Sequence, residues 1–252
     1  MVGWLALAGE RGRFRLEADR LGPLEVVRAA VYAPEGLSSR RLGRRLRRAE
    51  RALVRMGAGR VVLDAVFPYR DRLNLLRPVD PLPFWRGCAD VLALGALETE
   101  GVDRRRGCVA LSAPRLCPEL EGAAERLCSQ VRGLLIDAPA GADYARYLQQ
   151  RFGLPVTPLP AGADVTVAFG PDGGRWGRCV ELYEGGSLNG LALGAEGVEL
   201  PPGCEDQVLA LLWERGEFKR ESLCCRAAGR AGIPAEGPGV QTGKTVDTGR
   251  LS

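Results

Sequence analysis

Two short apolar runs without polar alternation flank an amphipathic segment near the middle of the chain. The runs are CVALSA at 108–113 and GLLIDA at 133–138, which is the composition expected of strands that helices cover on both faces. The segment between them carries apolar residues at helical spacing, on one stripe: Leu120, Ala123, Ala124, Leu127, Cys128 and Val131. A strand, a helix and a second strand in this order predict a parallel pair joined by a right-handed crossover.

A longer amphipathic helix is predicted over 38–56, where Ser38 or Ser39 can cap the first turn. Its apolar residues step by four and three along one face: Leu42, Leu46, Ala49, Leu53 and Met56. The rest of its surface is nearly all arginine, at positions 40, 41, 44, 45, 47, 48, 51 and 55.

The remaining apolar segments are shorter, and glycine and proline separate them. Residues 3–33 contain three strand-like runs joined by ERG and RLGP, which predicts a β-meander. Residues 163–200 contain short strand-like runs between glycine-rich turns, a pattern typical of an antiparallel meander. The other predicted elements are a buried strand at 60–65, a buried helix at 84–100, and helices at 141–152, 205–215 and 218–227.

These elements predict an α/β fold with a mainly parallel, Rossmann-like three-layer core, an N-terminal β-meander and a C-terminal β-rich extension. We expect the first meander over 1–37, the core over 38–160, and the antiparallel meander with closing helices over 161–228. Glycine, proline, threonine and charged residues dominate 229–252, which predicts a disordered tail.

The composition excludes several chemistries. The chain has no histidine, which removes the usual general base near neutral pH, the Ser-His and Cys-His pairs, and zinc sites that need imidazole. Its eight cysteines form no CxxC pair, which favours reduced, buried thiols in a cytoplasmic protein and predicts no metal site. No apolar run is long enough to span a bilayer, so we expect a soluble protein without a membrane partner.

Polar residues follow the predicted parallel strands at their carboxyl ends, where open α/β sheets bind ligands. Asp137 follows the 108–113 strand at the spacing that puts an acid on the ribose hydroxyls in dinucleotide-binding units. The turn before the helix, SAPRLC, has no glycine, so it lacks the GxGxxG that lets a backbone approach a pyrophosphate. The candidate ligand-binding residues are Asp64, Ser112, Arg115 and Asp137. The alternative is that Asp64 and Asp137 only cap loops at strand ends.

With the apolar helix at 84–100 before it, this unit resembles in its arrangement the cofactor-binding half of dehydrogenases, without the glycine fingerprint. The resemblance covers the middle third of the chain and implies a small molecule or a nucleotide as ligand. It leaves the identity of any cofactor open. No nucleophile–base pair or metal cluster can be named, so the sequence favours a binding protein or a degenerate enzyme over an active one.

Two other glycine-containing segments have some features of an anion site. GPDGGRWG at 170–177 could cradle an anion with Arg175, but strands flank it, which favours a hairpin turn. PGVQTGKT at 238–245 is similar to a phosphate-binding loop, but no apolar strand precedes it and too few residues follow for the helix that such a loop needs. We predict no phosphate site there.

The charge of the chain is unevenly distributed. Residues 38–56 carry eight Arg and one Glu, or +7, whereas the whole chain carries +4, so the remainder sums to −3. Such a helix predicts affinity for nucleic acid or an acidic protein, with a solvated or internally paired face as the alternative. Its candidate residues are Arg40, Arg44, Arg47, Arg48, Arg51 and Arg55. The sequence thus leaves three classes open, with small-ligand binding first, nucleic-acid or acidic-partner binding second, and a structural protein without a ligand third.

Overall fold

The chain forms a mixed α/β fold with two main sheets, both largely parallel, and the helices that cover them. The computed structural model describes residues 1–8, 14, 16–34, 36–64, 67–153 and 162–228. The predicted tail at 229–252 lies outside the described residues. No helix among the described ranges is long and apolar enough to cross a membrane.

The first sheet has the strand order β2-β3-β1-β4-β5. Its strands are β1 (Val2–Ala8), β2 (Leu16–Leu21), β3 (Leu24–Tyr32), β4 (Arg60–Leu63) and β5 (Arg77–Pro78). The expected β-meander is wrong, because β1 pairs in parallel with both β3 and β4, and only β2 and β3 form an antiparallel hairpin. The reason is that β1 is buried on both faces, so its apolar run suits a central strand rather than the edge of a meander.

The predicted arginine-rich helix is present as α1 (Ser39–Arg55), and it packs on one face of this sheet. Its buried stripe contains Leu42, Leu46, Ala49 and Leu53, as expected, whereas Met56 follows the helix and is exposed. Gly3 of β1 lies directly under Leu53, where an added Cβ would meet the leucine Cδ1 at 3.1 Å. The helix and the sheet therefore approach closely at this point.

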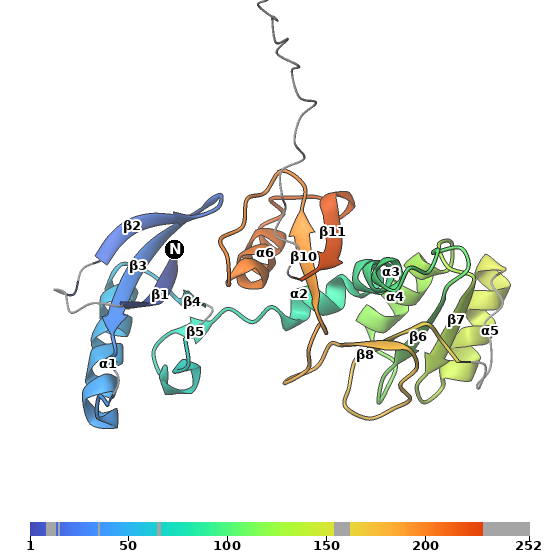
Figure 1. Ribbon diagram of the computed structural model, residues 1–252, viewed down its shortest axis with the longest axis horizontal. Helices are drawn as coiled ribbons and strands as arrows, with labels where there is room; N and C mark the ends of the chain where they lie inside the picture. Colours follow the sequence, from blue (N-terminus) through green and yellow to red (C-terminus); the bar gives the residue numbers. More distant parts are fainter. Residues whose placement is uncertain (9–13, 15, 35, 65–66, 154–161, 229–252) are drawn as a thin grey trace, which may run out of the picture.

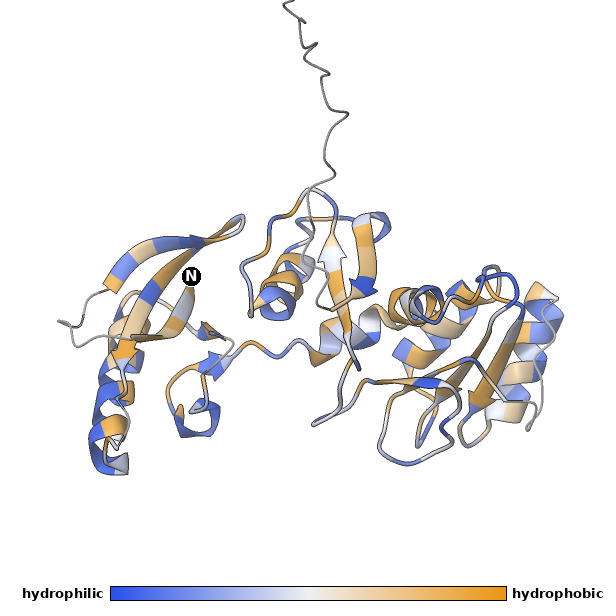
Figure 2. Ribbon diagram, viewed as in Figure 1, coloured by the Kyte–Doolittle hydropathy of each residue, from blue (hydrophilic) through white to orange (hydrophobic). Residues whose placement is uncertain are grey.

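The second sheet has the order β7-β6-β8-β9 and is parallel throughout. Its strands are β6 (Cys108–Ser112), β7 (Gly133–Asp137), β8 (Val165–Ala168) and β9 (Arg178–Glu181). The predicted strand–helix–strand unit is confirmed, because β6 and β7 pair in parallel and α4 (Pro118–Leu127) connects them. In Figure 2 the strands of this sheet are mostly orange, in keeping with their burial.

The predicted core is divided between these two sheets. The described residues therefore do not form the single three-layer core that the sequence predicted. Residues 39–63 join the sheet of residues 2–32, across the boundary expected at 37 and 38. Residues 165–181, expected in an antiparallel meander, extend the parallel sheet of β6 and β7. The segment between β8 and β9 contains no helix, so residues 169–177 form a loop where a Rossmann-like fold would have a crossover helix.

A middle region connects the two sheets (Figure 1). It contains α2 (Leu82–Gly87), α3 (Ala89–Thr99), α6 (Glu205–Glu214), β10 (Leu191–Ala195) and β11 (Leu223–Ala227). The helix predicted over 84–100 is thus two helices that meet at Cys88, and the helix predicted over 218–227 is instead mainly strand β11. Its burial alternates residue by residue, which is the period of a strand rather than of a helix.

One continuous core joins the parts. Val2 and Val62 of the first sheet belong to the same buried cluster as Val208 of α6 and Val109 of β6. The far end of the second sheet carries α5 (Gly141–Phe152), which packs on β7. The two sheets therefore share a core through the middle region.

Candidate functional site

Ser112 and Asp137 lie side by side at the carboxyl ends of β6 and β7. The parallel register pairs these two positions directly, and the Ser112 hydroxyl donates a hydrogen bond to Asp137 Oδ2 at 3.0 Å. Ser112 is fully buried, whereas Asp137 is partly exposed. The structure therefore brings together two of the four residues that the sequence placed at this edge.

The loop after β8 lies over the same edge. The backbone N–H of Gly174 donates to Asp137 Oδ2 at 2.7 Å, so that oxygen accepts two hydrogen bonds. Gly173 has a φ of 117°, and an added Cβ would lie 2.1 Å from Ser112 Oγ. Gly170 also packs closely against the neighbouring turn, because a Cβ there would meet Pro114 Cδ at 2.6 Å. Only glycine permits these approaches.

This loop is a crossover between parallel strands, and the hairpin predicted for 170–177 is wrong. It runs back along the sheet, where the buried Thr166 hydroxyl donates to the Trp176 carbonyl and accepts the Trp176 N–H. The Arg175 guanidinium, considered above as an anion ligand, donates to the carbonyls of Gly170 and Pro171, both at 2.9 Å. Its charge therefore closes the loop.

Asp64 and Arg115 take other positions. Asp64 follows β4 in the first sheet, and its charge contributes, after burial and Glu205, to raising the pKa of the Cys204 thiol to about 11. It therefore lies near the start of α6, not beside Ser112. Arg115 is exposed in the turn between β6 and α4, the turn that Gly170 contacts.

The edge does not fit a dinucleotide in the observed conformation. The turn at 113–117 has no glycine, and Gly170 of the loop packs against its Pro114. Glu119 and Glu121 occupy the first turn of α4, where they already complement the positive end of the helix dipole that would otherwise attract a phosphate. The pyrophosphate cradle of a dinucleotide site is therefore lacking at this position.

The described residues offer no activated nucleophile near this edge. The cysteine in the turn that follows β6 is Cys117, and burial raises the pKa of its thiol above the ordinary value, which disfavours the thiolate at neutral pH. Within the described part of the chain, no group of three or more Cys, Asp or Glu side chains could hold a metal ion.

A small cavity of about 210 Å³ opens at the start of α6. Its lining includes Arg70, Trp85, Cys204 and Asp206. Burial raises the pKa of the Asp206 carboxyl, and the Trp85 indole opposes this only in part. This cavity could not be predicted from the sequence, because residues far apart in the sequence form it.

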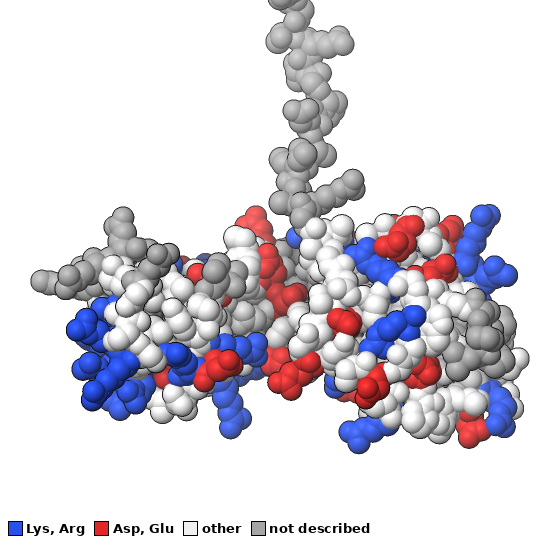
Figure 3. Space-filling model, turned by 60° about the horizontal axis from the view of Figure 1, so that its bottom comes forward, with Lys and Arg blue, Asp and Glu red and all other residues white. Residues whose placement is uncertain are grey.

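The exposed face of α1 is the other candidate site. Arg40, Arg44, Arg47, Arg48, Arg51 and Arg55 are all exposed. Figure 3 shows positive side chains gathered at the end of the molecule that α1 forms. The candidate residues of α1 therefore share one surface, remote from Ser112 and Asp137.

The fold and this edge define a mixed α/β protein built on parallel sheets. Neither a family model nor a curated protein matches the chain. One similar solved structure is the crystal structure of L-tryptophan dehydrogenase from Nostoc punctiforme, with 15% sequence identity and a TM-score of 0.29. The match covers 66% of this chain and 55% of that one, so the chain spans about half the length of that enzyme. A likeness this weak carries no functional argument.

Proposed function

We propose that the protein binds a small, hydroxyl-bearing ligand of the nucleotide class at the Ser112–Asp137 edge, without catalysing a reaction on it. The observation that carries this proposal is the pairing of Ser112 with Asp137 at adjacent carboxyl ends of parallel strands. This edge is where open α/β sheets hold ligands, and a carboxylate at the end of the second strand suits ribose hydroxyls.

The loop at 170–175 stands in for the ligand when none is bound. Gly174 donates its N–H to the same carboxylate oxygen that a ligand hydroxyl would use, so binding requires this segment to move. The apparent affinity is then the intrinsic affinity multiplied by the fraction of molecules in which the loop is open. Because the pyrophosphate cradle is lacking, the proposal favours a nucleoside or mononucleotide over a dinucleotide, with exposed Arg115 as the nearest cation in the turn.

Isothermal titration with adenosine, AMP and NAD tests this proposal on the unmodified protein and three variants. Gly173→Ala strains the closed loop against Ser112, so the proposal predicts tighter binding of adenosine or AMP than to the unmodified protein. Asp137→Ala should abolish that binding. Gly185→Ala is the matched control, because Gly185 also has a positive φ of 79° but no atom within 4 Å of its added Cβ.

Absence of binding to both the unmodified protein and Gly173→Ala would contradict the proposal. That result would favour a structural protein in which Asp137 only holds the loop. Binding that survives Asp137→Ala would place the ligand elsewhere.

A further inference from the structure

The arginine surface of α1, defined by Arg44, Arg47, Arg48, Arg51 and Arg55, forms no ion pair with an acid among the described residues. Ion pairs within the described ranges involve other arginines. The one acid of the helix, Glu50, is fully buried and does not lie on this surface. Its carboxylate accepts hydrogen bonds from the backbone N–H groups of residues 74–76. The alternative that the acidic remainder of the chain neutralises this face is therefore not supported.

This arrangement is unfavourable for an isolated helix. Arg44, Arg47, Arg51 and Arg55 follow one another at spacings of three and four residues, where like charges repel. The first turn holds Arg40 and Arg41 and no acid, which opposes the helix dipole. A local rule broken without local compensation is typical of a functional surface, and here a bound anion would provide the compensation.

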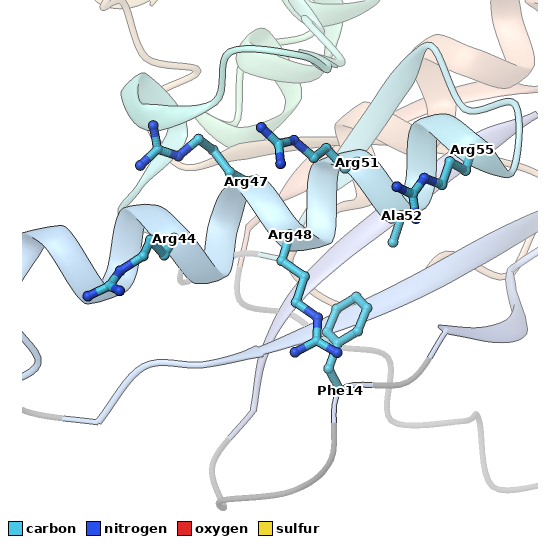
Figure 4. Close-up of a pocket in the computed structure, with 7 residues that line it drawn as sticks. All are labelled: Phe14, Arg44, Arg47, Arg48, Arg51, Ala52 and Arg55. Atoms are coloured by element: carbon cyan, nitrogen blue, oxygen red, sulfur yellow. The ribbon is translucent and has the colours of Figure 1, made fainter.

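The surface is shaped as well as charged. The five arginines line a shallow depression of about 570 Å³ together with Phe14 and Ala52 (Figure 4). Arg55 lies eleven positions after Arg44, which makes the row about 16 Å long at the rise of an α-helix. Such a row matches an extended chain of regularly spaced negative charges better than one compact anion.

We infer that this surface binds the phosphate backbone of a nucleic acid without reading its sequence. The Arg48 guanidinium lies over the Phe14 ring, 5.3 Å from the ring centroid. A nucleic-acid base therefore cannot stack on that face of the ring. An acidic protein is less well matched, because protein interfaces rely on buried aromatic or aliphatic anchors. Apart from Phe14, the depression is lined by five arginines and one small alanine. This inference does not depend on the ligand proposed for the Ser112–Asp137 edge.

Fluorescence anisotropy with a short DNA duplex, its single strand and poly-glutamate tests the inference on the full chain. If the five arginines contact five phosphates, duplex affinity should fall roughly 500-fold between about 50 and 200 mM salt. Replacing Arg44, Arg47 and Arg51 with alanine leaves two contacts, and the same salt change should then cost only about 12-fold. Circular dichroism checks that α1 remains folded.

The matched control replaces Arg105, Arg106 and Arg215 with alanine. These three arginines are exposed and lie outside α1, so the control changes the net charge equally and should retain the duplex affinity and its salt dependence. Equal losses in both variants would overturn the inference, because binding would then follow net charge alone. Tighter binding of poly-glutamate than of either nucleic acid would also overturn it, in favour of an acidic protein. Failure of every probe to bind would assign the surface to solvent.

Discussion

The Gly174 N–H and the Asp137 carboxylate form a hydrogen bond across 37 positions of sequence. The bond fixes the loop after β8 to the end of β7, and the neighbouring Gly173 fits against Ser112 only because it has no side chain. The stability of the second sheet and access to the proposed ligand edge are therefore coupled through one loop.

Gly173→Ala should destabilise the protein by about 2–3 kcal/mol, because the added methyl group combines positive-φ strain with a clash against Ser112 Oγ. Urea unfolding measures this loss. Gly185→Ala, which meets only the backbone strain, should cost about 1 kcal/mol. If the clash is real, the added substitution Ser112→Ala should recover part of the loss in a double-mutant cycle, whereas strict additivity would argue against contact between residues 112 and 173.

Glu50→Ala should cost about 3 kcal/mol, because one buried carboxylate oxygen accepts the N–H groups of Asn74 and Leu75 at 2.8 Å and of Leu76 at 3.3 Å. Glu50→Gln keeps an acceptor and should cost about 1 kcal/mol. Amide hydrogen exchange at residues 74–76 should accelerate most in the alanine variant. Unchanged exchange there would show that this carboxylate does not hold the segment, and Glu25→Ala serves as a control in an exposed ion pair.

The sequence predicted the elements better than their partners. The helical stripe of α1 and the β6–α4–β7 unit follow from local periodicity, so each could be recognised from its own residues. The position of β1 between β3 and β4 could not, because it depends on which apolar faces meet in the folded chain. The 170–177 loop shows the same limit, since Asp172, Gly173 and Gly174 suit a hairpin and a crossover equally well.

The candidate site was predictable only in part for the same reason. Residues at the ends of adjacent strands could be paired once a parallel unit was inferred, which gave Ser112 and Asp137. Asp64 was grouped with them on the assumption of one sheet, but it follows β4 of the first sheet, whereas Ser112 and Asp137 end strands of the second. The loop after β8 also contributes to this edge. The two glycines at 173 and 174 indicate a close backbone approach in the sequence, but only the fold shows that they approach Ser112 and Asp137.

Asp90→Asn should cost about 3 kcal/mol, because this buried carboxylate pairs with both Arg126 and Arg220 and its loss leaves both cations undercompensated. Arg220 leads into β11, so exchange protection of residues 223–227 should fall as well. The exposed pair of Asp143 and Arg146 provides the control, since Asp143→Asn should cost less than about 0.5 kcal/mol. Similar losses in the two variants would contradict a special role for the buried group.

Stability should fall above pH 9 through the buried Cys88 thiol. Burial raises its pKa from 9.0 to about 12 in the folded protein, so between these values the unfolded chain loses a proton that the folded chain retains. This contribution is fully present below pH 9 and is lost as the pH rises toward 12. By pH 10 the loss of unfolding free energy is about 1.4 kcal/mol. Urea unfolding from pH 8 to 10 should show a shallower decline in Cys88→Ala, and an unchanged slope would exclude this thiol as a cause.

Gln207 of α6 donates its side-chain amide to the Leu63 carbonyl and accepts the Leu63 N–H, continuing the end of β4 with groups from 144 positions further along the chain. On a ribosome, β4 emerges long before this partner does. The end of β4 therefore lacks these two hydrogen bonds until synthesis has passed α6. Premature termination upstream of Gln207 would release a chain in which the end of β4 stays without this partner.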